Sequence, residues 1–314
     1  MPVDDEAEIV AAMKAREKVL WVDIERPDGG DLRLLEEGLG FHPLSVRDVA
    51  ESHSAPKLDD YDGYVFQIVM VPKGCSEGRV ELIELSMYYM QGTLVTVRDE
   101  PWPALDGCWD AVKKDPVREL GKGAQTLYHT VVDRAVQAYE PVLNFVEDEI
   151  DDLEREVLDV DDGVSSLGTI FRLRRTVRRL MRLVRAQQES VHRLATGHVK
   201  SLRKETCYLF RDVADHLSLF YGMLDDHRET LAGLRDTYIG VASNRLNEVM
   251  KTLTVFSALL LPLTFLTGLW GMNFDVLPFA HHGQGFWIFL GLCAAVIGGL
   301  LWLMVRAGWL RRVQ

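Results

Sequence analysis

One face of a long apolar segment near the C-terminus carries small and mildly polar side chains. Its members, at steps of three and four, are Asn247, Met250, Thr254, Ser257, Leu261, Thr264, Gly268 and Gly271. Such steps place side chains on one side of an α-helix. In a single copy this face would be a packing seam for another helix. Around an axis of several copies it would line a pore, with apolar constrictions at Leu261 and Leu253 that can gate by dewetting.

The polar groups that this face can offer to a cation are neutral oxygen atoms. Neither apolar run, 253–270 or 286–305, contains an Asp, Glu, His, Lys or Arg. This argues against a proton-coupled carrier, which places an ionisable group in the membrane, and against a transition-metal site. The first run is followed by Gly271-Met272-Asn273. Rings of Asn273 amide oxygens and Gly271 carbonyls would accept hydrogen bonds from a hydrated cation, and Mg²⁺ gives up its water reluctantly.

The two apolar runs are each about 20 residues long, which is the length of a membrane-spanning helix. Basic residues flank them at Arg245, Lys251, Arg306, Arg311 and Arg312, whereas residues 271–285 between them contain no Lys or Arg. By the positive-inside rule, both ends of the chain are expected in the cytoplasm and the short loop outside.

The composition limits the partners. The 314 residues carry a formal net charge of −12, which disfavours nucleic acid and suits attraction of cations. The four cysteines are scattered without a C-x-x-C pair, as expected in a reducing compartment. The acidic N-terminus lacks the apolar core of a signal peptide. We therefore expect most of the chain to stay in the cytoplasm and the spans to lie in the plasma (inner) membrane.

Residues 1–120 are predicted to form an α/β domain. β-Branched and aromatic runs bounded by turn residues predict strands, and one short segment predicts a helix. The strands are expected at 19–24, 64–71, 81–89 and 93–98, and the helix at 31–38. A small sheet with helices around it is the natural arrangement of these elements.

Residues 121–246 are predicted to be helical, followed by a transmembrane domain at 247–314. An acidic stretch, 147–162, precedes a basic one, 171–185. The two either pair as an antiparallel hairpin with opposite charges facing each other, or present two solvated faces. A further periodic pattern from Glu205 onward predicts one very long helix that continues into the first span. Its length favours an oligomeric stalk.

Several motifs resemble the CorA family of magnesium transporters. The motifs are Asn247-Glu248-Val249-Met250-Lys251, Leu261-Pro262-Leu263-Thr264-Phe265, and Gly268 with Gly271-Met272-Asn273-Phe274. The similarity extends upstream to Phe41-His42-Pro43-Leu44 with Asp48, Pro56-Lys57, Tyr64-Val65-Phe66, and Phe210-Arg211-Asp212-Val213 with Asp215-His216. The Gly-Met-Asn triplet between two C-terminal spans is the defining signature of that family.

The resemblance implies an α+β membrane protein that assembles as a funnel-shaped homopentamer. It implies a selectivity ring at Asn273 with Gly271, Met272 completing the triplet. It implies a pore lined by Asn247, Leu253, Leu261 and Thr264, with an acidic ring at Asp236. It also implies a regulatory Mg²⁺ site between subunits at Asp48 and Asp212, whose occupancy would hold the pore closed. Mg²⁺ is thus both substrate and regulatory ligand, and no organic cofactor is expected.

The sequence departs from the pattern of this family in two places, and two alternative functions are considered beside the one that the resemblance implies. Trp270 stands where many members have Tyr, and the outer loop has few acids but carries His281 and His282, which can bind Co²⁺, Ni²⁺ or Zn²⁺. The first alternative to a passive Mg²⁺-gated channel is therefore a Zn²⁺, Ni²⁺ or Co²⁺ transporter of the same family. The second is a membrane-anchored enzyme or receptor. The sequence shows neither a nucleophile paired with a base nor a phosphate-binding G-x-x-x-x-G-K-[ST] loop, so it gives no support to an enzyme.

Overall fold

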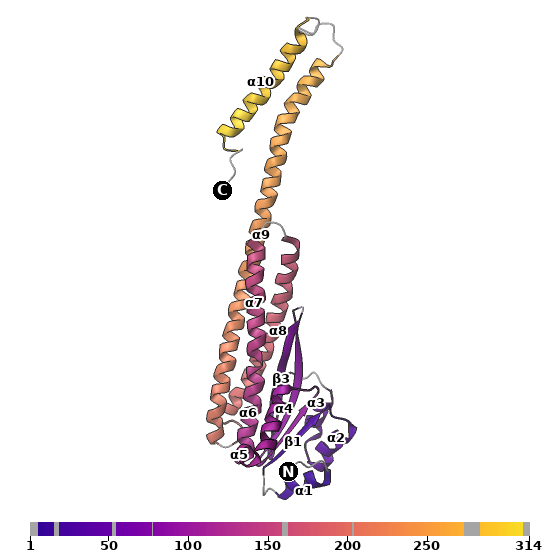
Figure 1. Ribbon diagram of the computed structural model, residues 1–314, viewed down its shortest axis with the longest axis vertical. Helices are drawn as coiled ribbons and strands as arrows, with labels where there is room; N and C mark the ends of the chain where they lie inside the picture. The colour runs from indigo at the N-terminus through magenta and orange to yellow at the C-terminus, as the bar shows by residue number, and fades with distance from the viewer. Residues whose placement is uncertain are drawn as a thin grey trace. The chain divides into compact units, whose positions relative to one another are not determined.

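The computed structural model describes residues 6–15, 19–51, 55–76, 78–158, 163–202, 204–272 and 283–309. The chain divides into two compact units, Met1–Asp236 and Thr237–Gln314. Figure 1 shows the elements of both. The three-part division predicted at residues 120 and 246 follows composition and stays a prediction.

A five-stranded sheet forms the centre of the first unit. Its strands are β1 (Leu20–Glu25), β2 (Lys57–Tyr61), β3 (Tyr64–Ser76), β4 (Arg79–Met90) and β5 (Thr93–Arg98), in the order β1-β5-β4-β3-β2. β1 pairs with β5 in parallel, and the other pairs are antiparallel. The four predicted strands are confirmed. β2 was not predicted, because it is a short edge strand in which only Leu58 is buried.

Helices cover both faces of this sheet. On one face, β-strand residues such as Ile24, Phe66 and Tyr88 pack with residues from α2 (Gly29–Arg33), η1 (Leu34–Gly38) and α3 (Pro43–Glu51). The predicted helix at 31–38 is thus divided between α2 and η1. On the other face, α6 (Ala124–Gln137) stacks Tyr128 on Tyr89 of β4, with ring centroids 5.1 Å apart. The remaining helices of this part are α1 (Glu6–Ala15), α4 (Pro103–Lys114) and α5 (Pro116–Leu120).

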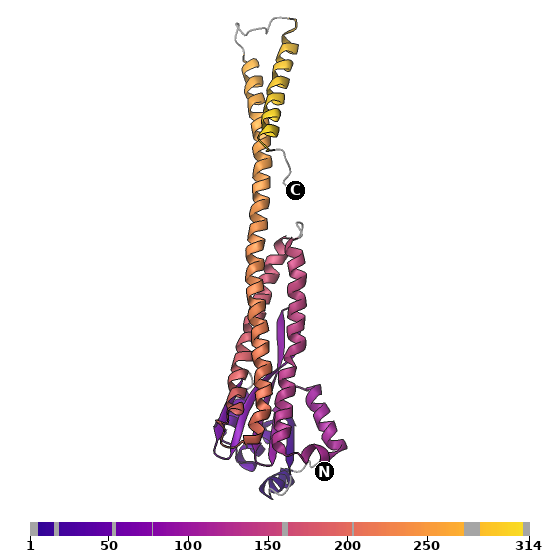
Figure 2. The ribbon, with the colours of Figure 1, turned by 90° about the vertical axis from the view of Figure 1, so that its left-hand side faces the viewer.

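Helices α7 (Tyr139–Leu158) and α8 (Gly163–Ala195) form the predicted hairpin and run side by side in both ribbon views (Figures 1 and 2). Their contact is apolar, because Ile150 and Leu153 of α7 and Val177 of α8 are buried. Within the described residues, a single ion pair, Arg172 to Glu149 at 3.6 Å, joins the two helices. Two solvated charged faces, rather than a charge-paired interface, therefore describe most of the hairpin.

Helix α9 (Lys204–Trp270) confirms the predicted long helix, and α10 (Gly285–Arg306) confirms the second apolar run. In the first unit, α9 buries residues at steps of three, four and seven: Phe210, Val213, Leu217, Phe220, Leu224, Leu231 and Leu234. This apolar stripe is what a helix needs to pack on a globular domain. α9 contributes residues to both units.

Arg98 at the end of β5 is buried and contacts three carboxylates, of which Asp23 is the most buried. Its Nη2 atom lies 3.0 Å from Asp23, 3.1 Å from Glu25 and 2.7 Å from Asp106. Burial raises the pKa of Asp23, although a hydrogen bond from Thr96 and the charge of Arg98 lower it in part. The ionised form of Asp23 thus depends on the arginine.

Arg98→Met should lower the free energy of unfolding by about 3–5 kcal/mol at pH 7.5, because it leaves the largely buried Asp23 carboxylate without its counter-charge. Protonation of Asp23 relieves that cost, so the deficit relative to the wild type should shrink as the pH falls toward 5. Denaturant unfolding of the purified protein at both pH values measures it. The exposed pair Arg118–Glu119, at 3.7 Å, gives the control. Arg118→Met should cost about 0.5 kcal/mol or less. A deficit independent of pH would contradict the role given to Asp23.

Candidate functional site

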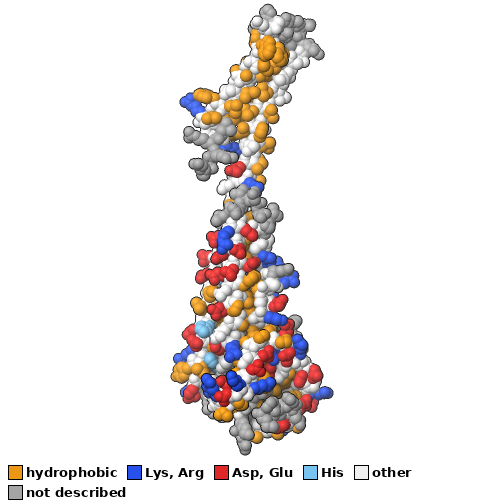
Figure 3. All heavy atoms as spheres, viewed as in Figure 1, with side chains coloured by type: hydrophobic (Ala, Val, Ile, Leu, Met, Phe, Trp, Pro, Cys, Tyr) orange, Lys and Arg blue, Asp and Glu red, His pale blue; other side chains and the backbone are white. Residues whose placement is uncertain are grey.

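The second unit exposes long apolar helices. The 253–270 part of α9 and helix α10 are long and apolar enough to cross a membrane, and neither apolar window is buried inside the chain. Leu261 and Phe265 are 71% and 66% exposed, and Trp287 of α10 is 68% exposed. Figure 3 shows hydrophobic side chains gathered along these helices, whereas charged side chains cover the first unit. Contiguous apolar surface on this scale must be covered by lipid or by other protein chains. These two helices are therefore candidate membrane spans.

The residues predicted to line a pore all lie on α9 and are exposed. They are Asn247, Met250, Leu253, Ser257, Leu261, Thr264 and Gly268. Leu261 has the largest exposed fraction among the exposed large apolar residues of this helix. In a single chain nothing covers the face that contains it. This exposure agrees with either reading of the face, a pore lining or a seam between helices, so the pore-lining role stays a proposal.

The hydroxyl groups on this face are held by the helix itself. Thr254 Oγ1 donates to the carbonyl of Met250 at 2.7 Å, and Thr264 Oγ1 donates to the carbonyl of Leu260 at 2.9 Å. A threonine whose proton is used in this way keeps its oxygen lone pairs as acceptors. The side chains can therefore accept hydrogen bonds from water around a cation without leaving a donor unsatisfied.

Helix α9 ends at the predicted selectivity triplet. The backbone amide of Gly271 donates to the Thr267 carbonyl at 2.9 Å. A Cβ atom at Gly271 would lie 3.1 Å from that same carbonyl oxygen, so glycine allows the close final turn. Trp270 contacts Phe289 of α10, with ring centroids 5.0 Å apart, and ties the two helices together at this end. Met272 follows as an exposed residue, whereas Asn273, His281 and His282 lie outside the described residues.

The structure places the predicted regulatory acids on different elements of the first unit. Asp48 on α3 is partly buried and accepts a hydrogen bond from Lys57 of β2. Lys57 also lies 3.0 Å from Asp59. Burial lowers the pKa of Lys57, but its contacts with Asp48 and Asp59 outweigh that effect and leave the pKa raised. Asp48 therefore already has a counter-charge within its own chain.

The other two acids are exposed on α9. Asp212 makes no ion pair in the part of the chain that the structure describes. Asp236 is paired with its neighbour Arg235, whose Nη2 atom lies 2.8 Å from the carboxylate. Surface pairs of this kind are weak and readily exchange partners. Both positions thus stay open to a cation or to another chain, and their roles stay predictions.

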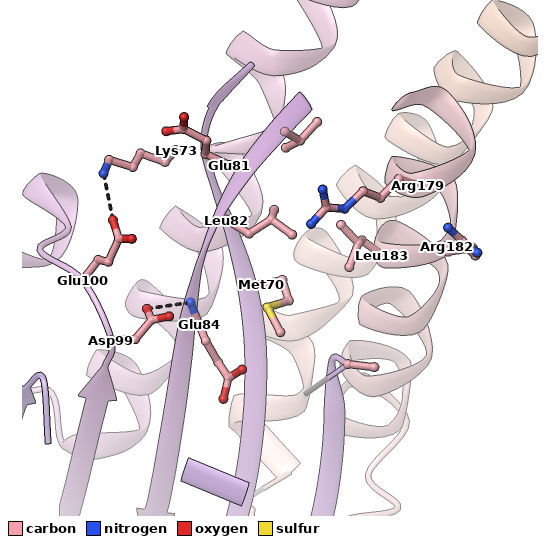
Figure 4. A pocket seen from close by; sticks show the side chains of 12 residues that line it. Met70, Lys73, Glu81, Leu82, Glu84, Asp99, Glu100, Arg179, Arg182 and Leu183 are labelled. Atoms are coloured by element: carbon pink, nitrogen blue, oxygen red, sulfur yellow. Dashed lines mark hydrogen bonds and ion pairs between the residues drawn. The ribbon is translucent and has the colours of Figure 1, made fainter. Parts of the chain in front are cut away.

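A cavity of about 660 Å³ between the β3–β4 hairpin and α8 offers no cation site of its own (Figure 4). Lys73 lies 2.8 Å from Glu100, and Asp99 accepts a hydrogen bond from the backbone amide of Glu84 at 3.0 Å. Arg179 and Arg182 also line the cavity. Its acids are thus offset by bases, and the described residues contain no group of three or more His, Cys, Asp or Glu side chains that could hold a metal.

Comparison with known proteins extends over nearly the whole chain. The family model described as CorA-like Mg²⁺ transporter protein matches residues 16–306. A Bacillus subtilis protein, YfjQ, is 31% identical over 92% of this chain and 89% of its own. The cobalt/magnesium transport protein CorA of Thermotoga maritima is 28% identical over 91% of this chain and 80% of its own. The zinc transport protein ZntB of Enterobacter sp. (strain 638) is 25% identical over 85% and 81%.

The fold has a full-length counterpart among solved structures. The CorA magnesium transporter from Methanocaldococcus jannaschii superposes with a TM-score of 0.79, at 22% identity, over 92% of this chain and 91% of that one. The shared architecture is the N-terminal α/β domain, the long helix and the two C-terminal candidate spans. At this identity the likeness concerns the fold alone.

Proposed function

Because the chain belongs to the CorA-like Mg²⁺ transporter family, we propose that several copies surround a pore along α9 that imports hydrated Mg²⁺. The observation that carries this proposal is the uncharged, oxygen-bearing face of α9, exposed in the single chain and ending at Gly271. The family consists of ion transporters, and its members carry divalent cations. The membrane potential supplies the driving force, since two charges moving inward gain roughly 4.6 kcal/mol per 100 mV.

In this proposal, Gly271, Met272 and Asn273 form the outer selectivity ring. The amide oxygens of Asn273 accept hydrogen bonds from the water around the ion rather than replacing that water. The hydroxyl of Thr264 then continues the contact with the hydration shell. The Leu261 and Leu253 rings close the pore by excluding water when the helices approach one another.

Regulation comes from Mg²⁺ in the cytoplasm. Five copies would bring Asp212 of one subunit toward Asp48 of the next, and Mg²⁺ bound there would favour the closed state over the open one. The ring of Asp236 would hold cations at the cytoplasmic entrance. In this proposal the protein lies in the plasma membrane with both termini in the cytoplasm. Its cytoplasmic part therefore senses the same ion that the pore imports.

A second candidate is transport of Zn²⁺, Ni²⁺ or Co²⁺. The similarity to ZntB proteins and the His281-His282 pair in the outer loop favour it. Imidazole suits these metals better than it suits Mg²⁺. The two candidates differ in the ion that permeates.

Flux into liposomes separates the candidates. Purified protein is reconstituted, a potassium diffusion potential is set, and entry of Mg²⁺, Zn²⁺ and Ni²⁺ is recorded with and without a pH gradient. Potential-driven Mg²⁺ entry that is blocked by internal Mg²⁺ supports the proposal. Zn²⁺ or Ni²⁺ flux that follows the pH gradient, with no Mg²⁺ entry, overturns it in favour of the second candidate.

Asn273→Ala should reduce Mg²⁺ flux about tenfold or more, because an interaction of about 1.4 kcal/mol with the hydrated ion is lost. Gln284→Ala removes a neutral amide at the start of α10 and serves as the control, with flux expected close to the wild type. The elution volume of each variant in detergent confirms that the assembly is intact. Unchanged Mg²⁺ flux in an assembled Asn273→Ala protein would remove the selectivity role from this residue.

Lys57→Met should tighten regulatory Mg²⁺ binding roughly fivefold, because a competing ammonium worth ~1 kcal/mol is removed from Asp48. Mg²⁺ protection of the full-length protein from proteolysis gives the half-saturating concentration. Lys73→Met removes the Lys73–Glu100 pair away from Asp48 and should leave that concentration unchanged. Equal Mg²⁺ protection in the wild type and in Lys57→Met would mean that Asp48 serves only its own chain.

A further inference from the structure

Helix α8 concentrates positive charge in an acidic protein. It contains eight arginines and one glutamate, whereas the whole chain has a net charge of −12. Four of these arginines recur at steps of three, four and three: Arg175, Arg178, Arg182 and Arg185. Such steps form a continuous stripe on one side of the helix.

This stripe lines a cavity shared with α9. The cavity has a volume of about 540 Å³, which lies in the range of small-ligand sites. Its lining consists of the four arginines of the stripe together with Met181, Tyr221 and Arg228. Met181 is nearly buried and provides an apolar wall, and Tyr221 contributes an aromatic ring from α9. No carboxylate lines this cavity among the residues that the structure describes.

The positive charge in the cavity is largely uncompensated. Arg228 pairs with Asp225 on its own helix at 2.8 Å. Arg178 donates from Nε to the backbone carbonyl of Arg174 at 3.3 Å, which leaves its charge without a counter-ion. For the described part of the chain, no carboxylate lies within 4.0 Å of a guanidinium nitrogen of the four stripe arginines. Like charges gathered in one cavity repel each other, and a bound anion removes that cost.

A neighbouring side of α8 faces a second cavity, which is lined by carboxylates as well as arginines. There, Arg179 points toward Leu82 of the hairpin, in the cavity that also contains Glu81, Glu84, Asp99 and Glu100 (Figure 4). Arg182 borders both cavities, and Figure 4 shows its guanidinium directed away from the hairpin. The cavity beside the hairpin therefore contains carboxylates, whereas no carboxylate lines the cavity between α8 and α9 among the described residues.

We propose that the cavity between α8 and α9 binds a polyphosphate anion. Guanidinium groups bind phosphate oxygens in pairs through two parallel N–H bonds, and several neighbouring phosphates can engage several arginines at once. A single phosphate would leave most of the five arginines without a contact. Tyr221 and the planar guanidinium groups can also stack on a nucleobase, so the polyphosphate is either inorganic or part of a nucleotide. This site is independent of the proposed conduction along α9.

Calorimetric titration of the full-length protein in detergent, in 150 mM salt and without divalent cations, tests the site with three probes. The probes are inorganic tripolyphosphate, ATP and monophosphate. Tripolyphosphate should bind, and monophosphate should bind at least about tenfold more weakly, because fewer charge-assisted hydrogen bonds form. ATP binding that is tighter than tripolyphosphate binding, and that Tyr221→Ala reduces, identifies the nucleotide as the ligand. Equal binding of the two identifies the phosphate chain.

The double variant Arg175→Gln/Arg178→Gln should weaken tripolyphosphate binding by about tenfold or more. The matched control Arg174→Gln/Arg118→Gln removes the same charge from outside the cavity and should change binding by less than about twofold. All four side chains are surface groups, and unfolding curves verify that both proteins fold. Absence of tripolyphosphate binding in the wild type, or an equal loss in both variants, overturns the proposal.

The acidic helix α7, with eight carboxylates and one arginine, is the competing occupant if a second copy presents it to the stripe. In that case tripolyphosphate would not bind to the assembled protein, and Arg175→Gln/Arg178→Gln would weaken the assembly more than the control does and reduce its dependence on salt. That outcome also overturns the proposal and assigns the cavity to a contact between copies of this chain.

Discussion

The need to cover apolar side chains on α9 is the constraint on which the rest of the structure depends. In the first unit, Phe210, Leu217 and Leu224 are buried against the domain to which the helix belongs. From Leu253 onward the same helix exposes side chains that its own chain does not cover. The uncovered part can only be stable in lipid, against other copies or in both. The same run of apolar residues thus accounts for the candidate span and underlies the proposed assembly.

The apolar part of α9 contains no charged side chain. In the first unit, charged side chains are accommodated in three ways. The buried guanidinium of Arg98 contacts the carboxylates of Asp23, Glu25 and Asp106. Lys57 gives Asp48 a partly exposed partner within the same chain. Helices α7 and α8 bury apolar side chains between them and send most of their opposite charges outward, where they are available to ions and partners.

The sequence predicts those structural elements that depend on the pattern of neighbouring residues. β5 begins and ends at the predicted residues, and the spans appear where the apolar runs are, because alternation and long apolar stretches each act over neighbouring residues. The β2 strand, the Lys57–Asp48 contact and the direction of charge on α7 and α8 were not predictable in this way. Each is decided by which elements pack together, and one-dimensional spacing does not contain that information. For the site, the sequence locates the α9 face, whereas the geometry of Asn273 lies outside the described residues.

The absence of charge from the predicted pore face is itself an argument about the ion. A ring of carboxylates in a low-dielectric environment would attract a divalent cation strongly, and conduction requires binding that is weak enough to release the ion. Neutral acceptors such as the Thr264 hydroxyl stabilise a hydrated ion through its water, at a fraction of that energy. An ion that keeps its water, such as Mg²⁺, gains the most from such a lining. One that prefers direct imidazole or thiolate ligands would find none along this face of α9, where the thioether of Met250 is the sole sulfur, so any preference for Zn²⁺ would have to arise outside it.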